Sequence, residues 1–171
     1  MSTDQFTTST ESSAPVGVAA DQVDVRGPRF AAWVTTTVLV AVFVAAAFST
    51  AAAAVLVGLQ AIVFAVGAAV GPRRSPYGRL YGKFVAPRLG KPTEKEPVAP
   101  LRFAQLLGFV FAAIAFLGFV AGPPVIGAIF TGFALFAAFL NAAFGVCLGC
   151  QIYPLVARLR RNNVSTTERA A

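Results

Sequence analysis

Four long apolar runs without a charged side chain constrain this chain more than any other feature. They cover residues 30–48, 51–70, 103–121 and 125–146. Each is close to the ~20 residues that an α-helix needs to cross ~30 Å of hydrocarbon. Because a bilayer offers no partner to backbone polar groups, runs that span it are helical. The sequence therefore predicts an all-α membrane protein with four transmembrane helices.

The composition agrees with this fold class. Hydrophobic residues make up 57% and charged residues 12% of the chain, whereas a soluble domain has roughly a quarter charged residues. The net charge of +7 would also suit nucleic acid, but the basic residues flank the apolar runs and no aromatic stripe lies among them to stack on bases. We therefore expect no nucleic-acid partner, and we expect the lipid bilayer and its anionic headgroups to attract this charge.

The basic residues also predict an orientation. All 14 Lys and Arg lie in the N-terminal flank, the central segment or the C-terminal segment, and the tight turns at residues 49–50 and 122–124 have none. With four spans, the three basic segments share one side of the membrane. The positive-inside bias makes that side cytoplasmic, so we predict that both termini are cytoplasmic.

One transmembrane domain is predicted at residues 23–161. Residues 1–22 and 162–171 have few large apolar side chains to offset the entropy cost of ordering, so we expect two disordered tails. The domain reads as two halves, residues 24–90 and 98–161.

These halves form a predicted internal repeat of two spans each. Pro28-Arg-Phe-Ala recurs as Pro100-Leu-Arg-Phe-Ala, and each half continues as span, turn, span and basic amphipathic segment. In this alignment Ser75-Pro76-Tyr77-Gly78 occupies the place of Cys147-Leu-Gly-Cys150. Because each repeat has two spans, we expect a pseudo-two-fold axis along the membrane normal.

Short interfacial amphipathic helices are expected after the second and fourth spans. Leu80, Tyr81 and Phe84 fall on one helical face beside basic residues, which is typical of a helix in the headgroup region. We predict that this helix ends at Pro87 and that a polar linker follows at residues 91–100.

Both cysteines lie where the fourth apolar run ends, and they are the only reactive pair in the sequence. The chain has no His, and no carboxylate lies within an apolar run. Four alternatives stay open for Cys147 and Cys150. They could exchange a disulfide, relay sulfane sulfur as a persulfide, supply half of a metal site that a homodimer completes, or pack as small apolar residues. Because the motif follows a helix, its local dipole counts against an activated thiolate.

Polar groups inside the predicted spans are few. Asn141, Gln60 and Gln105 are candidates for a substrate path, although a single amide is also common as a link between membrane helices. Ser75-Pro76-Tyr77-Gly78 is typical of a β-turn with proline at its second position.

The strings Arg-Ser-Pro-Tyr-Gly at residues 74–78 and Asn-Ala-Ala-Phe-Gly-Val-Cys-Leu-Gly-Cys-Gln-Ile-Tyr at residues 141–153 carry a family resemblance. The chain resembles, over roughly residues 24–160, the bacterial integral membrane family catalogued as domain of unknown function 4395. The resemblance implies a location in the bacterial cell membrane. It also implies an expected link to thioredoxin-like or rhodanese-type sulfurtransferase proteins, which are often encoded near family members.

Two hypotheses follow from the sequence. In the first, Cys147 and Cys150 exchange disulfide or sulfane sulfur with a soluble thioredoxin-like or rhodanese-type partner, and no cofactor or metal is required. In the second, the chain is a small-solute transporter or membrane scaffold in which the cysteines only pack. The scarcity of polar groups in the spans favours the first.

Overall fold

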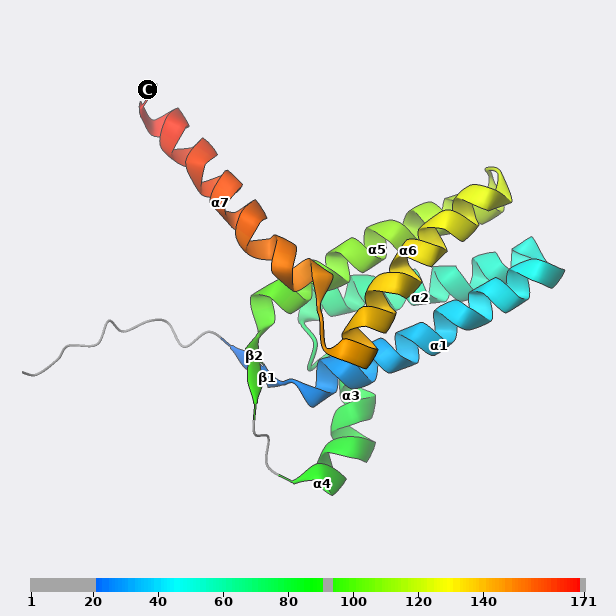
Figure 1. Ribbon diagram of the computed structural model, residues 1–171, viewed down its shortest axis with the longest axis horizontal. Helices are drawn as coiled ribbons and strands as arrows, with labels where there is room; N and C mark the ends of the chain where they lie inside the picture. Colours follow the sequence, from blue (N-terminus) through cyan, green and yellow to red (C-terminus); the bar gives the residue numbers. More distant parts are fainter. Residues whose placement is uncertain (1–20, 91–93, 170–171) are drawn as a thin grey trace, which may run out of the picture.

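The computed structural model describes residues 21–90 and 94–169, with side chains described as far as residue 158. Four long helices run side by side (Figure 1): α1 at Arg26–Phe48, α2 at Thr50–Val70, α5 at Val98–Val120 and α6 at Pro124–Phe144. Each is long and apolar enough to cross a membrane, with hydropathies of 2.0 to 2.4. The prediction of an all-α membrane protein with four spans is confirmed.

The four helices close into a bundle of two hairpins. α1 turns into α2 at Ser49, whose side chain accepts a hydrogen bond from the Ala52 N–H at 3.3 Å, and α5 turns into α6 through residues 121–123. The closest association joins α2 to α5, and α1 packs on α6. These pairings are the ones that two repeated halves would make, but the repeat itself stays a prediction.

Small residues let the helices approach closely in the half of the bundle that holds the two hairpin turns. A methyl group at Gly118 would lie 2.5 Å from the backbone nitrogen of Gly127, so α5 and α6 touch there through their backbones. The buried core of the bundle contains alanine, aliphatic and phenylalanine side chains. Its members are Leu39, Val42, Ala53, Ala54, Val57, Ala61, Phe64, Ala112, Ala115, Phe119 and Ala134.

A segment between the hairpins folds against the opposite, basic end of the bundle. It consists of α3 at Pro76–Leu80, a π-helical turn at Tyr81–Val85 and α4 at Ala86–Leu89. The prediction that this helix ends at Pro87 is wrong, because α4 continues to Leu89. Pro87 lies in the first turn of α4, where a missing N–H costs nothing. Gly90, at φ 68°, ends the segment.

Two short strands lie beside this segment. β1 at Gln22–Asp24 pairs antiparallel with β2 at Lys95–Pro97, and Val23 in the middle of β1 is buried. The prediction of a linker over residues 91–100 is wrong for β2 and for the first turn of α5, because a three-residue strand carries too short a pattern to be recognised. Of the predicted N-terminal tail, residues 1–20 lie outside the described residues.

The last helix, α7 at Leu148–Arg169, leaves the bundle (Figure 1). Its first turns pack on α5, where the rings of Phe103 and Tyr153 lie 5.9 Å apart. Its backbone continues through residues 162–169, where we predicted a tail; residues 170–171 lie outside the described residues.

Candidate functional site

The cysteine pair lies at a break between α6 and α7 that one glycine creates. Gly145 has a φ of 70°, in the left-handed region. Its N–H donates to the Asn141 carbonyl at 3.1 Å, and the Val146 N–H donates to the Leu140 carbonyl at 3.3 Å. These bonds satisfy the last carbonyls of α6 and end the helix. The fourth span therefore stops at Phe144, and the chain turns before it reaches Cys147.

Cys147 begins a new helix. Its Sγ accepts a hydrogen bond from the Cys150 N–H at 3.3 Å, and its carbonyl accepts one from the Gln151 N–H at 3.1 Å. Cys147 therefore has the N-cap position of α7, and the prediction that its local helix dipole disfavours a thiolate is wrong. The residues on both sides of the break are apolar, so Gly145 is the only sign of the helix end in the sequence. A helix N-terminus stabilises negative charge and hence a thiolate.

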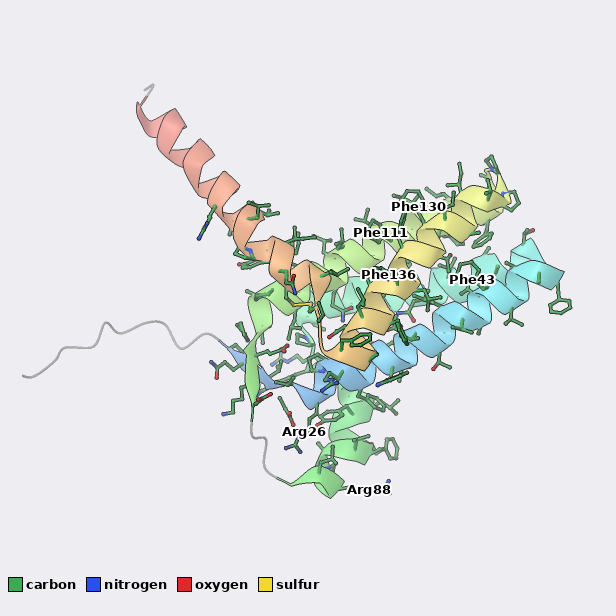
Figure 2. The ribbon with its side chains drawn as sticks, viewed as in Figure 1. Arg26, Phe43, Arg88, Phe111, Phe130 and Phe136 are labelled. Atoms are coloured by element: carbon green, nitrogen blue, oxygen red, sulfur yellow. A yellow bond between two sulfur atoms is a disulfide. The ribbon has the colours of Figure 1, made fainter. Side chains whose placement is uncertain are left out.

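The two sulfur atoms are bonded to each other as a disulfide. The Cα atoms of Cys147 and Cys150 are 5.2 Å apart, within the range of ~4.4–6.8 Å that disulfides span. Figure 2 draws the sulfur–sulfur bond at the start of α7. Both residues are half-buried, so neither cysteine is fully enclosed in the fold.

Glycine between the cysteines fixes their position against α5. Gly149 is buried, and a methyl group there would lie 2.7 Å from both Cα and Cβ of Ala104. No side chain fits in this gap. The backbone of the motif is therefore seated directly on α5.

A cavity of about 710 Å³ opens next to the disulfide, between α1, α5 and α6. Cys147 lines it, as do Asn141 from α6 and Gln105 from α5; Cys150 is not among the lining residues. Its wall is otherwise mostly apolar. Polar lining residues include Asp24, Arg73, Ser75 and Tyr81, and Phe111, Phe133, Phe136 and Ala137 belong to the apolar part of the wall.

The three predicted path residues are not all brought together. Asn141 and Gln105 lie in the cavity wall, whereas Gln60 is 1% exposed within the bundle and is not among the residues that line it. The Gln60 Oε1 accepts a hydrogen bond from the Tyr77 hydroxyl at 2.7 Å. Its Nε2 is buried without a hydrogen-bond partner among the described residues.

Ser75-Pro76-Tyr77-Gly78 is the start of a helix and not an isolated β-turn. The Ser75 hydroxyl accepts a hydrogen bond from the Gly78 N–H at 3.1 Å and donates one to the Pro72 carbonyl at 2.8 Å. Ser75 thus caps α3 as Cys147 caps α7, in both cases by bonding the N–H three residues on. The two aligned motifs, residues 75–78 and 147–150, therefore have the same capping hydrogen bond at the start of a helix.

A polar cluster that sequence reasoning missed lies at the basic end of the cavity. The Tyr81 hydroxyl donates to Asp24 Oδ2 at 3.0 Å, and Asp24 Oδ1 lies 3.8 Å from Arg26 Nε. Burial raises the pKa of Tyr81, and the hydrogen bond and charge of Asp24 raise it further. The sequence pattern predicts Tyr81 on an interfacial face. The signal for its contact with Asp24 is the Val-Asp pair before the first span, which belongs to β1.

Cys147 and Cys150 have no further candidate metal ligand beside them in the described part of the chain, so a metal site there would need ligands from a second chain. Within residues 21–90 and 94–169, no group of three or more His, Cys, Asp or Glu side chains is close enough to hold a metal ion. The disulfide also occupies both sulfur atoms that a metal would need as thiolates.

Comparison with known proteins identifies a family. A family model described as "Domain of unknown function (DUF4395)" matches residues 23–158, which include the four long helices and both cysteines. The resemblance in the sequence motifs is thereby confirmed. No curated protein and no solved structure matches the chain.

Proposed function

The chain belongs to the DUF4395 family, and we propose that it is a membrane thiol–disulfide exchange protein in which Cys147 and Cys150 cycle between disulfide and dithiol. The observation that carries the proposal is the disulfide itself, formed at the N-terminus of α7. A cysteine at a helix N-terminus in a Cys-x-x-Cys motif has the surroundings in which a thiolate is stabilised.

The exchange needs only the two cysteines and a partner with two thiols. A partner thiolate attacks one sulfur of the Cys147–Cys150 bond, which breaks and leaves the other sulfur as a thiolate. The second partner thiolate then attacks the mixed disulfide. The partner ends oxidised, and Cys147 and Cys150 end as a dithiol after taking up two protons from the partner or from water.

A soluble thioredoxin-like or rhodanese-type protein is the partner that we propose. The cysteine pair opens α7, and Gly149 between the cysteines contacts Ala104, two residues after Arg102. Arg73 lines the same cavity as Cys147, and the α3–α4 segment folds against this end of the bundle (Figure 1). By the positive-inside bias this end is cytoplasmic, in the bacterial cell membrane. The cysteines are half-buried, so a docked partner could reach them from the aqueous side.

One observation favours a second candidate. The cavity reaches Asn141, which a small-solute transporter would require, and membrane transporters bind their substrates at such internal sites. In that case the disulfide would only brace the start of α7. A sulfane-sulfur relay is a third outcome, in which Cys147 or Cys150 carries a persulfide whose outer sulfur is passed to or from the thiolate of a soluble sulfurtransferase.

Maleimide mass-shift labelling in intact cells tests the proposal. It compares the native protein, Cys147→Ser and Cys150→Ser, each with and without prior reduction. We expect the native protein to be labelled only after reduction, and one single-cysteine variant to trap a soluble protein as a mixed disulfide. A trapped persulfide would assign the relay instead.

The same labelling experiment can contradict the proposal. Thiols that are free in the native protein and react only after denaturation would overturn the exchange reaction and leave the transporter. Single-cysteine variants that accumulate like the native protein in the membrane make the comparison valid.

A further inference from the structure

We infer that the cavity beside Cys147 binds a lipid-soluble quinone, which accepts the two electrons released when Cys147 and Cys150 form their disulfide. The inference rests on the proposed thiol–disulfide exchange and adds the acceptor that regenerates the disulfide. Exchange with a partner leaves the pair reduced, so a second reaction has to oxidise it again.

The cavity has the size and the wall that such a molecule requires. Its ~710 Å³ lies within the ~300–1,000 Å³ of typical ligand pockets. Phe111 from α5 and Phe136 from α6, both labelled in Figure 2, contribute aromatic rings to a mostly apolar wall. These rings offer an aromatic ligand the offset or edge-on contacts that aromatic groups prefer.

The cavity is reachable from the bilayer. Phe133 and Phe136 belong to its wall although 54% and 60% of their surfaces are exposed. The cavity therefore reaches the apolar outer face of α6, which lies within a span. A molecule dissolved in the membrane can enter there without crossing water.

Two amides suit the polar atoms of this ligand. Within the described part of the chain, no residue makes a hydrogen bond to the side chain of Gln105 or Asn141, and neither amide is sealed from the cavity as Gln60 Nε2 is sealed within the bundle. A side-chain amide both donates and accepts hydrogen bonds. The same residue can therefore donate to a quinone carbonyl and accept from a quinol hydroxyl.

The sulfur that faces the cavity is the one at the N-terminus of α7. Cys147 lines the cavity and Cys150 does not. The Cys147 thiolate adds to the quinone, and the Cys150 thiolate then attacks Cys147 Sγ. The sulfur–sulfur bond forms, and the bond between Cys147 and the quinone breaks with its electron pair on the quinone. Two protons, one from each original thiol, complete the quinol, so one dithiol and one quinone give one disulfide and one quinol.

Single-turnover oxidation of the reduced protein in phospholipid nanodiscs tests this inference. The probe is decylubiquinone, whose fully substituted ring has no hydrogen-bearing position at which thiols form stable adducts. We measure quinol formation by absorbance and disulfide formation by maleimide mass shift. The expected result is one quinol for each disulfide, with both products lost in Cys147→Ser and Cys150→Ser.

Cavity variants separate a bound quinone from a collision at the surface. Ala137→Phe places a phenyl ring in the cavity and should slow quinol formation at least about tenfold, because the quinone ring no longer has room to bind. Gln105→Leu and Asn141→Leu should slow it as well. Ala47→Phe, at an exposed site on α1 outside the cavity wall, and Gln60→Leu, which removes an amide elsewhere in the bundle, should not.

Exchange with dithiothreitol is measured on the same samples without quinone. If this exchange proceeds but no quinol forms, or if Ala137→Phe and Ala47→Phe react equally fast, the quinone site is wrong and the thiol exchange stands. If the disulfide does not exchange at all, the proposed function itself fails. A tightly bound phospholipid in native mass spectra that excludes decylubiquinone would also overturn the quinone site.

Discussion

Gly149 lies so close to Ala104 that a methyl group on it would come within 2.7 Å of both Cα and Cβ of Ala104. The position of the cysteine pair against α5 therefore depends on a residue without a side chain. The atoms of α5 nearest to Gly149 are Cα and Cβ of Ala104. These atoms cannot move aside as the end of a flexible side chain can.

Gly149→Ala should push α7 away from α5 and destabilise the fold by about 1–3 kcal/mol, the usual cost of overpacking. Thermal unfolding in detergent measures this effect. Gly82→Ala is the matched control, because a Cβ there meets nothing within 4 Å, and its unfolding temperature should change little or rise. Equal loss of stability in both variants would show that the contact with Ala104 does not fix the motif.

Tyr77 and Gln60 form a hydrogen-bonded pair whose loss should be measurable. Tyr77→Phe leaves a buried amide without any partner and should cost about 1–3 kcal/mol of unfolding free energy. Gln60→Leu should cost less, because it removes the buried polar group together with its Nε2. In the double variant, Gln60→Leu should recover much of the loss due to Tyr77→Phe. An additive double variant would contradict this account.

Alkaline pH should destabilise the protein in part through Tyr81. Burial first, and then the hydrogen bond and charge of Asp24, raise the pKa of Tyr81 above its ordinary value of 10.0, against a smaller opposing effect of Arg26. Because the folded pKa is the higher one, this contribution to stability is fully present below pH 10 and is lost as the pH rises through the folded pKa.

Unfolding of the native protein and Tyr81→Phe at a series of pH values checks this prediction. The native protein should lose stability above about pH 10, and Tyr81→Phe should lose less over the same interval. Part of the decline should remain in the variant, because burial also raises the pKa of Tyr77. Parallel curves for the two proteins would rule out the contribution of Tyr81.

The sequence predicted the elements whose signal is long and missed those whose signal is short. The spans were recognisable because about 20 uncharged residues leave a bilayer helix as the only satisfactory arrangement. The β1–β2 pair has three residues in each strand, and tertiary contact holds it together rather than a local pattern. The Asp24–Tyr81 contact joins residues 57 apart, which no local spacing reveals.

The candidate site divides in the same way. Cys147 and Cys150 were identifiable as the only reactive pair, but their place at a helix N-terminus depends on the φ of one residue, Gly145. Because the residues on both sides of Gly145 are apolar, the end of α6 and the start of α7 look like one continuous span in the sequence. Gln60 and Gln105 looked alike in the sequence, and only the packing of α2 against α5 puts one inside the bundle and the other in the cavity wall.

The helix break also predicts that the two thiols differ in reactivity. In Cys150→Ser, the remaining Cys147 sits at the N-cap of α7, where the helix dipole stabilises a thiolate by ~0.3–1 kcal/mol, so iodoacetamide should modify it about two- to fivefold faster at neutral pH than it modifies Cys150 in Cys147→Ser. Alkylation rates by mass spectrometry provide the measurement, and the same variants unfolded in denaturant should react equally. If Cys150 reacts faster in the folded protein although both unfolded variants match, access decides reactivity at this site and the helix dipole does not.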